Sequence, residues 1–142
     1  CPSDSAAVWT TPAAPPVNNY YTTSYLLNAY MSGNMPYTKQ SAVQATSKVV
    51  LLTESAFALS NDHFHPFNWV QETPSTNPYY SNYMHGVTFD DTKNQTKEIA
   101  LTRHLEGFNV AYCDGHVKWT KWTMAWPPKA GEPATGIFDP RQ

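Results

Sequence analysis

The sequence predicts an α+β fold that is mostly β, built on a single antiparallel sheet with long Pro- and aromatic-rich loops. Twelve prolines among 142 residues limit helix formation, because proline lacks an amide donor and clashes with the preceding helical turn. The run 49–52 holds four consecutive aliphatic residues, as expected of a core strand. Asp114-Gly115 stands between two alternating runs, a strong signal for a hairpin. The length suits one domain over 1–142.

The first half of the chain suggests an arm followed by one strand. Residues 1–19 are rich in proline and alanine, and we expect an extended arm there. Residues 20–31 are rich in Tyr, Thr and Leu, which favours a strand. The stretch "SGNMP" should end it. Residues 38–47 fit one short helix or turn.

The second half begins with the strongest strand prediction, residues 48–55, which we expect to be buried on both faces. Residues 56–86 contain three prolines and are predicted to form one long loop, a type that is usually functional or packed against a partner. Two short strands around a polar turn should follow, the second near 99–102. Residues 120–142 are aromatic and Pro-rich and are predicted to be a mostly irregular tail, which the sheet should not need in order to fold.

The hairpin prediction includes a register. A two-residue type I′ turn at Asp114-Gly115 places Cys113 opposite His116, and Gly115 suits it because glycine adopts positive φ without strain. Since strand side chains alternate between faces, one hairpin face should be apolar and the other polar. The expected apolar face consists of Val110, Tyr112, Val117 and Trp119.

Composition narrows the function classes. Charged residues are only 14% of the chain, the net charge is −2 and no basic run occurs, so a nucleic-acid partner is not expected. No apolar run approaches the length of a membrane span, so no membrane contact by this chain is expected either. Aromatics also make up 14%, and many should be exposed or buried against a partner. The first residues lack a secretion signal and a starting Met, as in a processed or truncated product.

The chain has two cysteines, Cys1 and Cys113. A disulfide between them would close a very long loop and stabilise the fold by roughly 4 to 5 kcal/mol. Alternatively, Cys1 has lost a partner upstream or is the acylated residue of a lipoprotein. An activated thiol formed by Cys113 and His116 is a further, weaker alternative.

Several motifs together resemble one family. His104 is followed after nine residues by Asp114-Gly115, and this pattern resembles the H-x9-DG motif of prepilin-type, processing-associated proteins, which are pilin-like and pseudopilin-like. "CPSD" at 1–4, "SYLLNAYM" at 24–31 and "VVLLTES" at 49–55, which includes Glu54, resemble further family segments in the family's order.

The resemblance implies a pilin-like globular domain without the family's N-terminal helix, which is absent from this sequence and is a candidate upstream partner segment. It also implies an extracellular or cell-surface location in a bacterium. On this basis we expect a structural subunit that associates with itself into a pilus-like filament or surface assembly. Low charge density and exposed aromatics agree with self-association. The expected contact residues in the tail are Trp119, Trp122, Trp126 and Phe138.

Two loop segments are candidate metal sites. His63 and His65 should point the same way on an extended segment, and with Asp62 nearby they could contribute to a zinc site. Glu54 or His116 would have to supply further ligands. The oxygens of Asp90 and Asp91, with Asn94 and Glu98, could bind calcium, although the glycine and spacing of an EF-hand are missing. The default expectation is no cofactor.

Three function classes follow, in decreasing order of support. The first is the self-associating structural subunit. The second is a secreted module that binds carbohydrate or a cell surface through exposed Tyr and Trp. The third is a metal-dependent enzyme that uses His63 and His65. The chain has no nucleophile elbow and no phosphate-binding loop, and we expect it not to be an enzyme.

Overall fold

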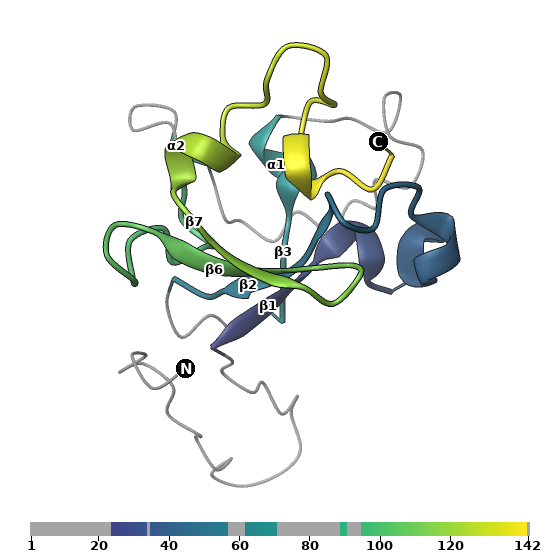
Figure 1. Ribbon diagram of the computed structural model, residues 1–142, viewed down its shortest axis with the longest axis horizontal. Helices are drawn as coiled ribbons and strands as arrows, with labels where there is room; N and C mark the ends of the chain where they lie inside the picture. Colours follow the sequence, from purple (N-terminus) through teal and green to yellow (C-terminus); the bar gives the residue numbers. More distant parts are fainter. Residues whose placement is uncertain (1–23, 34, 57–61, 71–88, 91–94, 142) are drawn as a thin grey trace, which may run out of the picture.

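The computed structural model describes residues 24–33, 35–56, 62–70, 89–90 and 95–141. A five-stranded sheet in the order β3-β1-β2-β6-β7 forms its centre (Figure 1). Its strands are β1 (Tyr25–Asn28), β2 (Val50–Glu54), β3 (His63–Phe64), β6 (Phe108–Tyr112) and β7 (Val117–Thr120). The protein is mostly β, as predicted, but the sheet is mixed because β1 and β3 run parallel. The expectation of a purely antiparallel sheet is therefore wrong.

The remaining elements are short. β4 (Phe89–Asp90) and β5 (Gln95–Thr96) form a separate antiparallel pair, so the second predicted short strand lies earlier than 99–102. The helical segments are η1 (Ala29–Met31), η2 (Pro36–Thr38), η3 (Gln40–Ala42), α1 (Pro66–Trp69), α2 (Trp122–Ala125) and η4 (Gly136–Phe138). None of these described helices has the length and apolar character needed to cross a membrane.

A β-bulge in β2 explains how four consecutive aliphatic residues fit one strand. Val50 pairs with Tyr112 and Leu52 pairs with Ala111, so Leu51 is the extra residue. Val49 and Val50 are both fully buried, but in two different hydrophobic clusters. Leu52 is 36% exposed, and the prediction of burial on both faces is therefore wrong at that position.

The β6–β7 hairpin forms where predicted, but its register differs by one residue. Ala111 pairs with Val117, and the Gly115 amide donates to the Tyr112 carbonyl across a three-residue loop. Gly115 has a φ of +95°, which fits a turn followed by a bulge. A shift of one residue moves every side chain of a strand to the other face. Val117 and Trp119 therefore lie opposite the face that carries Val110 and Tyr112.

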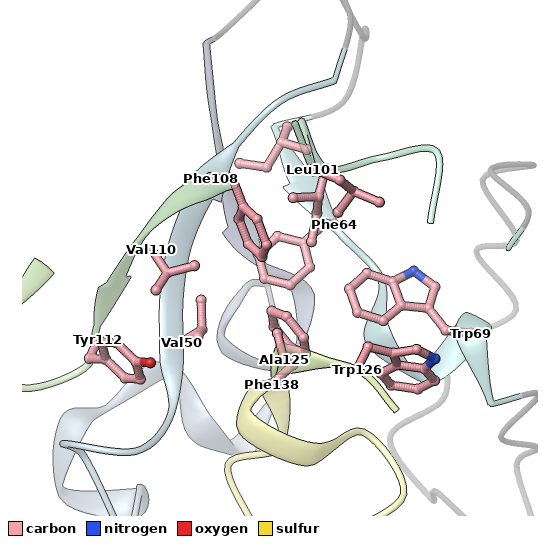
Figure 2. Close-up of a cluster of buried hydrophobic side chains, with 12 residues drawn as sticks. Val50, Phe64, Trp69, Leu101, Phe108, Val110, Tyr112, Ala125, Trp126 and Phe138 are labelled. Atoms are coloured by element: carbon pink, nitrogen blue, oxygen red, sulfur yellow. The ribbon is translucent and has the colours of Figure 1, made fainter. Parts of the chain in front are cut away.

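The main core lies between the sheet and the segments that cover one of its faces. Figure 1 shows α1, α2 and the yellow C-terminal segment on this side of the sheet. Phe138 contacts Phe64 and Trp69 edge-to-face, with ring centroids 5.7 and 5.1 Å apart (Figure 2). Trp126 stacks on Trp122 at 5.8 Å. The tail is therefore part of the core, which argues against the expectation that the sheet folds without residues 120–142.

Asn28 joins the sheet to this C-terminal segment. Its side chain is fully buried, and its Nδ2 donates to the carbonyls of Val50 and Phe138, both at 2.8 Å. Its Oδ1 accepts from the Tyr30 amide at 3.2 Å. Because both ends of the amide have partners, the buried polar group costs little and fixes the tail against β1.

The opposite side of the sheet, the outer face, carries a row of apolar side chains. Leu27 pairs with Leu52, Leu52 with Ala111, and Ala111 with Val117, so one apolar residue of each strand lies in a line across four strands. Tyr25 and Trp119 lie on the same face in the neighbouring row. The outer face is defined here as Tyr25, Leu27, Leu52, Ala111, Val117 and Trp119.

Candidate functional site

His104 forms a pair with a buried carboxylate instead of approaching the Asp-Gly turn. Its Nε2 lies 2.7 Å from Oε1 of Glu54, which is only 1% exposed. The Asn109 amide donates to Oε2 of the same carboxylate at 3.0 Å. Glu54 is thus buried with a hydrogen-bond partner on each oxygen, as burial of a carboxylate requires.

A tight turn next to His104 makes this contact geometrically feasible. The amides and carbonyls of His104 and Gly107 exchange two hydrogen bonds, at 2.9 and 3.0 Å. Leu105 and Glu106 between them both have positive φ, as in a two-residue type I′ turn. A two-residue turn therefore occurs here, whereas the one predicted at Asp114-Gly115 is wrong. A side chain at Gly107 would collide with Trp119, whose Cε2 lies 2.5 Å from a Cβ built there.

Asp114, Gly115 and His116 form the other end of the motif. Asp114 Oδ1 accepts from the His116 amide at 3.1 Å and lies 2.6 Å from His116 Nδ1. These hydrogen bonds, the backbone one first, lower the pKa of Asp114. The His116 ring also stacks on Tyr112, with 4.2 Å between centroids. These contacts stabilise the turn and leave His104 out of it.

The nine-residue spacing of the motif now has a structural explanation. The residues between His104 and Asp114 supply the 105–107 turn, the five residues of β6 and the first loop residue, Cys113. His104 and Asp114 therefore lie at opposite ends of β6 and do not converge on a metal. The motif fixes both ends of one strand.

His63, His65 and Asp62 lie together but have different environments. The two imidazole rings are in contact, with centroids 4.6 Å apart, which agrees with their pointing the same way. Asp62 binds His63, and this hydrogen bond lowers the pKa of Asp62. Neither Glu54 nor His116 joins them. Across the part of the chain that the structure describes, no group of three or more potential ligands is placed to hold a metal ion.

His65 belongs instead to a buried network that sequence reasoning missed. Glu98 is fully buried, and its Oε1 lies 2.7 Å from His65 Nδ1. Its Oε2 accepts from the His65 amide at 3.0 Å and from Trp69 Nε1 at 2.9 Å. The position of Glu98 next to Ile99, in an apolar stretch, could have indicated its burial. From the sequence, Glu98 is interpreted as a possible calcium ligand instead.

The calcium prediction falls mostly outside the described residues. Asp90 ends β4, whereas Asp91 and Asn94 lie outside the described ranges. Glu98, the fourth suggested oxygen ligand, is occupied by His65 and Trp69. It therefore cannot also serve as a calcium ligand in this conformation.

Cys113 carries a free thiol, and Cys1, its suggested disulfide partner, lies outside the described residues. Its Sγ is 3.5 Å from Sδ of Met31. Burial, with a smaller contribution from Asp114, raises the pKa of the thiol to about 11. An activated Cys113–His116 nucleophile requires the opposite shift, and His116 binds Asp114 and stacks on Tyr112, so the structure does not support that alternative.

Alkylation tests this environment of Cys113. In a Cys1→Ser variant, iodoacetamide should react at pH 8 about tenfold more slowly than with an exposed cysteine peptide, because the smaller thiolate fraction outweighs its higher intrinsic nucleophilicity. The rate should keep rising as the pH approaches 11. A rate that reaches its plateau near pH 8 would contradict the buried environment.

Of the four aromatic residues expected in self-association, one has a large exposed fraction. Trp119 is 43% exposed, whereas Trp126 and Phe138 are 6% and 0% exposed. Trp122 is partly buried against the main core. The prediction is therefore wrong for Trp126 and Phe138, since their rings are already used in the core of their own chain.

The outer face holds four of the six exposed large hydrophobic side chains of the described residues. Val117, Tyr25, Trp119 and Leu52 are 68%, 48%, 43% and 36% exposed. Glu54 lies in the same row as Tyr25 and Trp119 but is buried and paired with His104. Clustered exposed apolar side chains of this kind mark interaction sites on soluble proteins.

Comparison of the chain with protein-family models, with curated proteins and with solved structures found no match.

Proposed function

We propose that this chain is a structural subunit that associates with copies of itself through the outer face, as part of an extracellular filament or surface assembly. The observation that supports this proposal is the uninterrupted apolar row Leu27–Leu52–Ala111–Val117. The pilin-like resemblance of the H-x9-DG motif agrees with it and suggests the kind of assembly. Catalysis has no comparable support among the described residues.

A second copy of the chain is the occupant that fits this face best. The row contains no charged side chain, and His63 of β3, which adjoins it beside Leu27, is paired with Asp62. Two copies can therefore pack face to face without desolvating an unpaired charge. Such a contact uses the same patch on both subunits, as in symmetric dimers. Its aromatic members, Tyr25 and Trp119, belong to the residue types enriched at interface centres.

Charge substitutions at the centre of the row test the proposal. Val117→Lys and Leu52→Lys should each weaken self-association by at least about tenfold, since each would bring an ammonium group into an apolar contact. Analytical ultracentrifugation over a concentration series measures the association, and negative-stain microscopy shows whether larger assemblies form.

Met124→Lys is the matched control. Met124 is 65% exposed on α2, which covers the other side of the sheet (Figure 1). This variant should associate like the unmodified chain, and circular dichroism should show all three variants folded. An unmodified chain that stays monomeric at every concentration, or a Val117→Lys variant that assembles normally, would refute the proposal.

A further inference from the structure

A cleft on the far side of β7 from the outer face gathers basic residues from distant parts of the sequence. Its volume is about 830 Å³, and it lies between the start of β2, the β6–β7 hairpin and the C-terminal segment. Lys48, Lys118 and Arg141 line it. Three of the nine Lys and Arg residues of a chain with net charge −2 therefore meet in one place.

The two lysines keep their charge available for a ligand. In the described part of the chain, neither Lys48 nor Lys118 forms an ion pair with a carboxylate. Glu132 is the acidic residue of the lining, and its Oε2 already accepts from the Lys129 amide at 2.8 Å. The lining therefore carries more positive than negative charge.

Arg141 is held in place by the fold. Its Nε and one Nη donate to the two oxygens of buried Asp139 at 2.7 and 2.6 Å, and its guanidinium lies 5.1 Å from the centre of the Tyr30 ring. Burial opposes ionisation of Asp139, but the hydrogen bonds from Arg141 outweigh it and lower the pKa of that carboxyl. Arg141 thus forms a fixed wall of the cleft, whereas the flexible lysines can adjust to a ligand.

Aromatic and apolar groups form another part of the wall, beside the polar Ser47 and Glu132. The His116 ring lies flat on Tyr112, with 8° between their planes, and Pro133 and Ile137 line the cleft beside them. The flat apolar sides of such groups can pack against the C–H face of a sugar ring. Lysine ammonium groups bind carboxylate and sulfate without a demand for one fixed geometry.

We propose that this cleft binds an acidic glycan, with Lys48 and Lys118 contacting its carboxylate or sulfate groups. The cleft is open to solvent, which suits a segment of a longer chain. The site is separate from the proposed self-association surface, because Lys118 and Val117 are neighbours on β7 and point to opposite faces. An assembly could therefore present the cleft while its outer face is covered.

Calorimetric titration of the full chain tests the proposal with three probes: a uronic-acid oligosaccharide, a sulfated oligosaccharide and a neutral glucan of equal length. At least one acidic glycan should bind, the neutral glucan should bind at least about tenfold more weakly, and added salt should weaken the acidic interaction. Whichever acidic glycan binds more tightly identifies the preferred anionic group.

The variant Lys48→Gln/Lys118→Gln should lose at least about tenfold in affinity for the acidic glycan. Lys39→Gln/Lys97→Gln removes the same charge from exposed positions outside the cleft and should bind like the unmodified chain.

The proposal is overturned by equal losses in both variants, by equal affinity for the neutral glucan, or by the absence of any glycan binding. Tighter binding of poly-glutamate than of either acidic glycan would also overturn it. Self-association of the cleft variant should be unchanged, which separates this test from that of the outer face.

Discussion

Phe138→Ala is expected to destabilise the chain by about 3 to 5 kcal/mol, the usual cost of removing a buried phenylalanine ring. The side chain is fully buried and lies between Phe64 and Trp69, four residues from the end of the sequence. The cavity left behind cannot collapse easily, because its walls are aromatic rings held by other elements. Urea denaturation followed by tryptophan fluorescence measures the loss, which is a large fraction of the stability of a typical domain.

Met124→Ala is the matched comparison from the same C-terminal segment. Met124 is 65% exposed, so its truncation should change the free energy of unfolding by less than about 0.5 kcal/mol. Deleting residues 121–142 should leave the chain unfolded, since the deletion also removes Trp126 and the carbonyl that accepts from Asn28. A truncated chain that unfolds cooperatively at the same urea concentration would show that the tail does not contribute to the core.

The sequence predicts the positions of strands and turns correctly where a short local pattern determines them. Asp114-Gly115 located the hairpin because Gly115 must adopt positive φ, and the aliphatic run located β2. The same dipeptide fits either a two-residue turn or a three-residue loop with a bulge, and the choice depends on tertiary contacts. Here the Cys113 amide donates to Val49 and the Asp114 amide to Thr46. These contacts lie far away in the sequence, so the register of β7 could not be predicted from the hairpin alone.

The parallel strand β3 was missed for a related reason. It has two residues, His63 and Phe64, which is too short for any periodicity to appear. Its place in the sheet depends on pairing with β1 and on the Leu27 amide, which donates to the Asp62 carbonyl at 2.9 Å. The tail was misjudged because proline and tryptophan content indicates irregular backbone, and irregular backbone can still pack into a core.

The sites predicted from the sequence differ most from those in the structure, because they depend on contacts between distant segments. The motif relates His104 to Asp114 by sequence spacing alone, whereas in the structure His104 binds Glu54, fifty residues away in the sequence. The cleft basic residues at 48, 118 and 141 form no basic run, and only the fold brings them together. The proposed contact residues no longer include Trp126 and Phe138. They now include Leu52 and Val117, so the proposed self-association surface lies on the sheet and not in the tail.

Glu98→Gln is expected to cost about 3 to 5 kcal/mol, the range for breaking a buried charged network by altering one partner. The carboxylate accepts from the His65 amide and Trp69 Nε1 and lies 2.7 Å from His65 Nδ1. A glutamine keeps the shape but replaces one acceptor oxygen with an NH₂ group. At the Oε2 position this NH₂ group faces the two N–H donors, and at the Oε1 position it keeps a hydrogen bond only if His65 Nδ1 is an unprotonated acceptor. Both arrangements remove the negative charge that the donors contact and weaken the link between the segment that carries β3 and α1 and residues 95–99.

Glu106→Gln is the control for charge alone. Glu106 is exposed and lies 3.9 Å from Lys121, and a surface pair of this kind contributes little to stability. Urea denaturation should therefore show a large shift of the midpoint for Glu98→Gln and almost none for Glu106→Gln. Amide hydrogen exchange adds a local readout, because the His65 amide should exchange faster in the Glu98 variant than in the control. Equal midpoints for the two variants would show that the carboxylate of Glu98 does not hold this side of the core together.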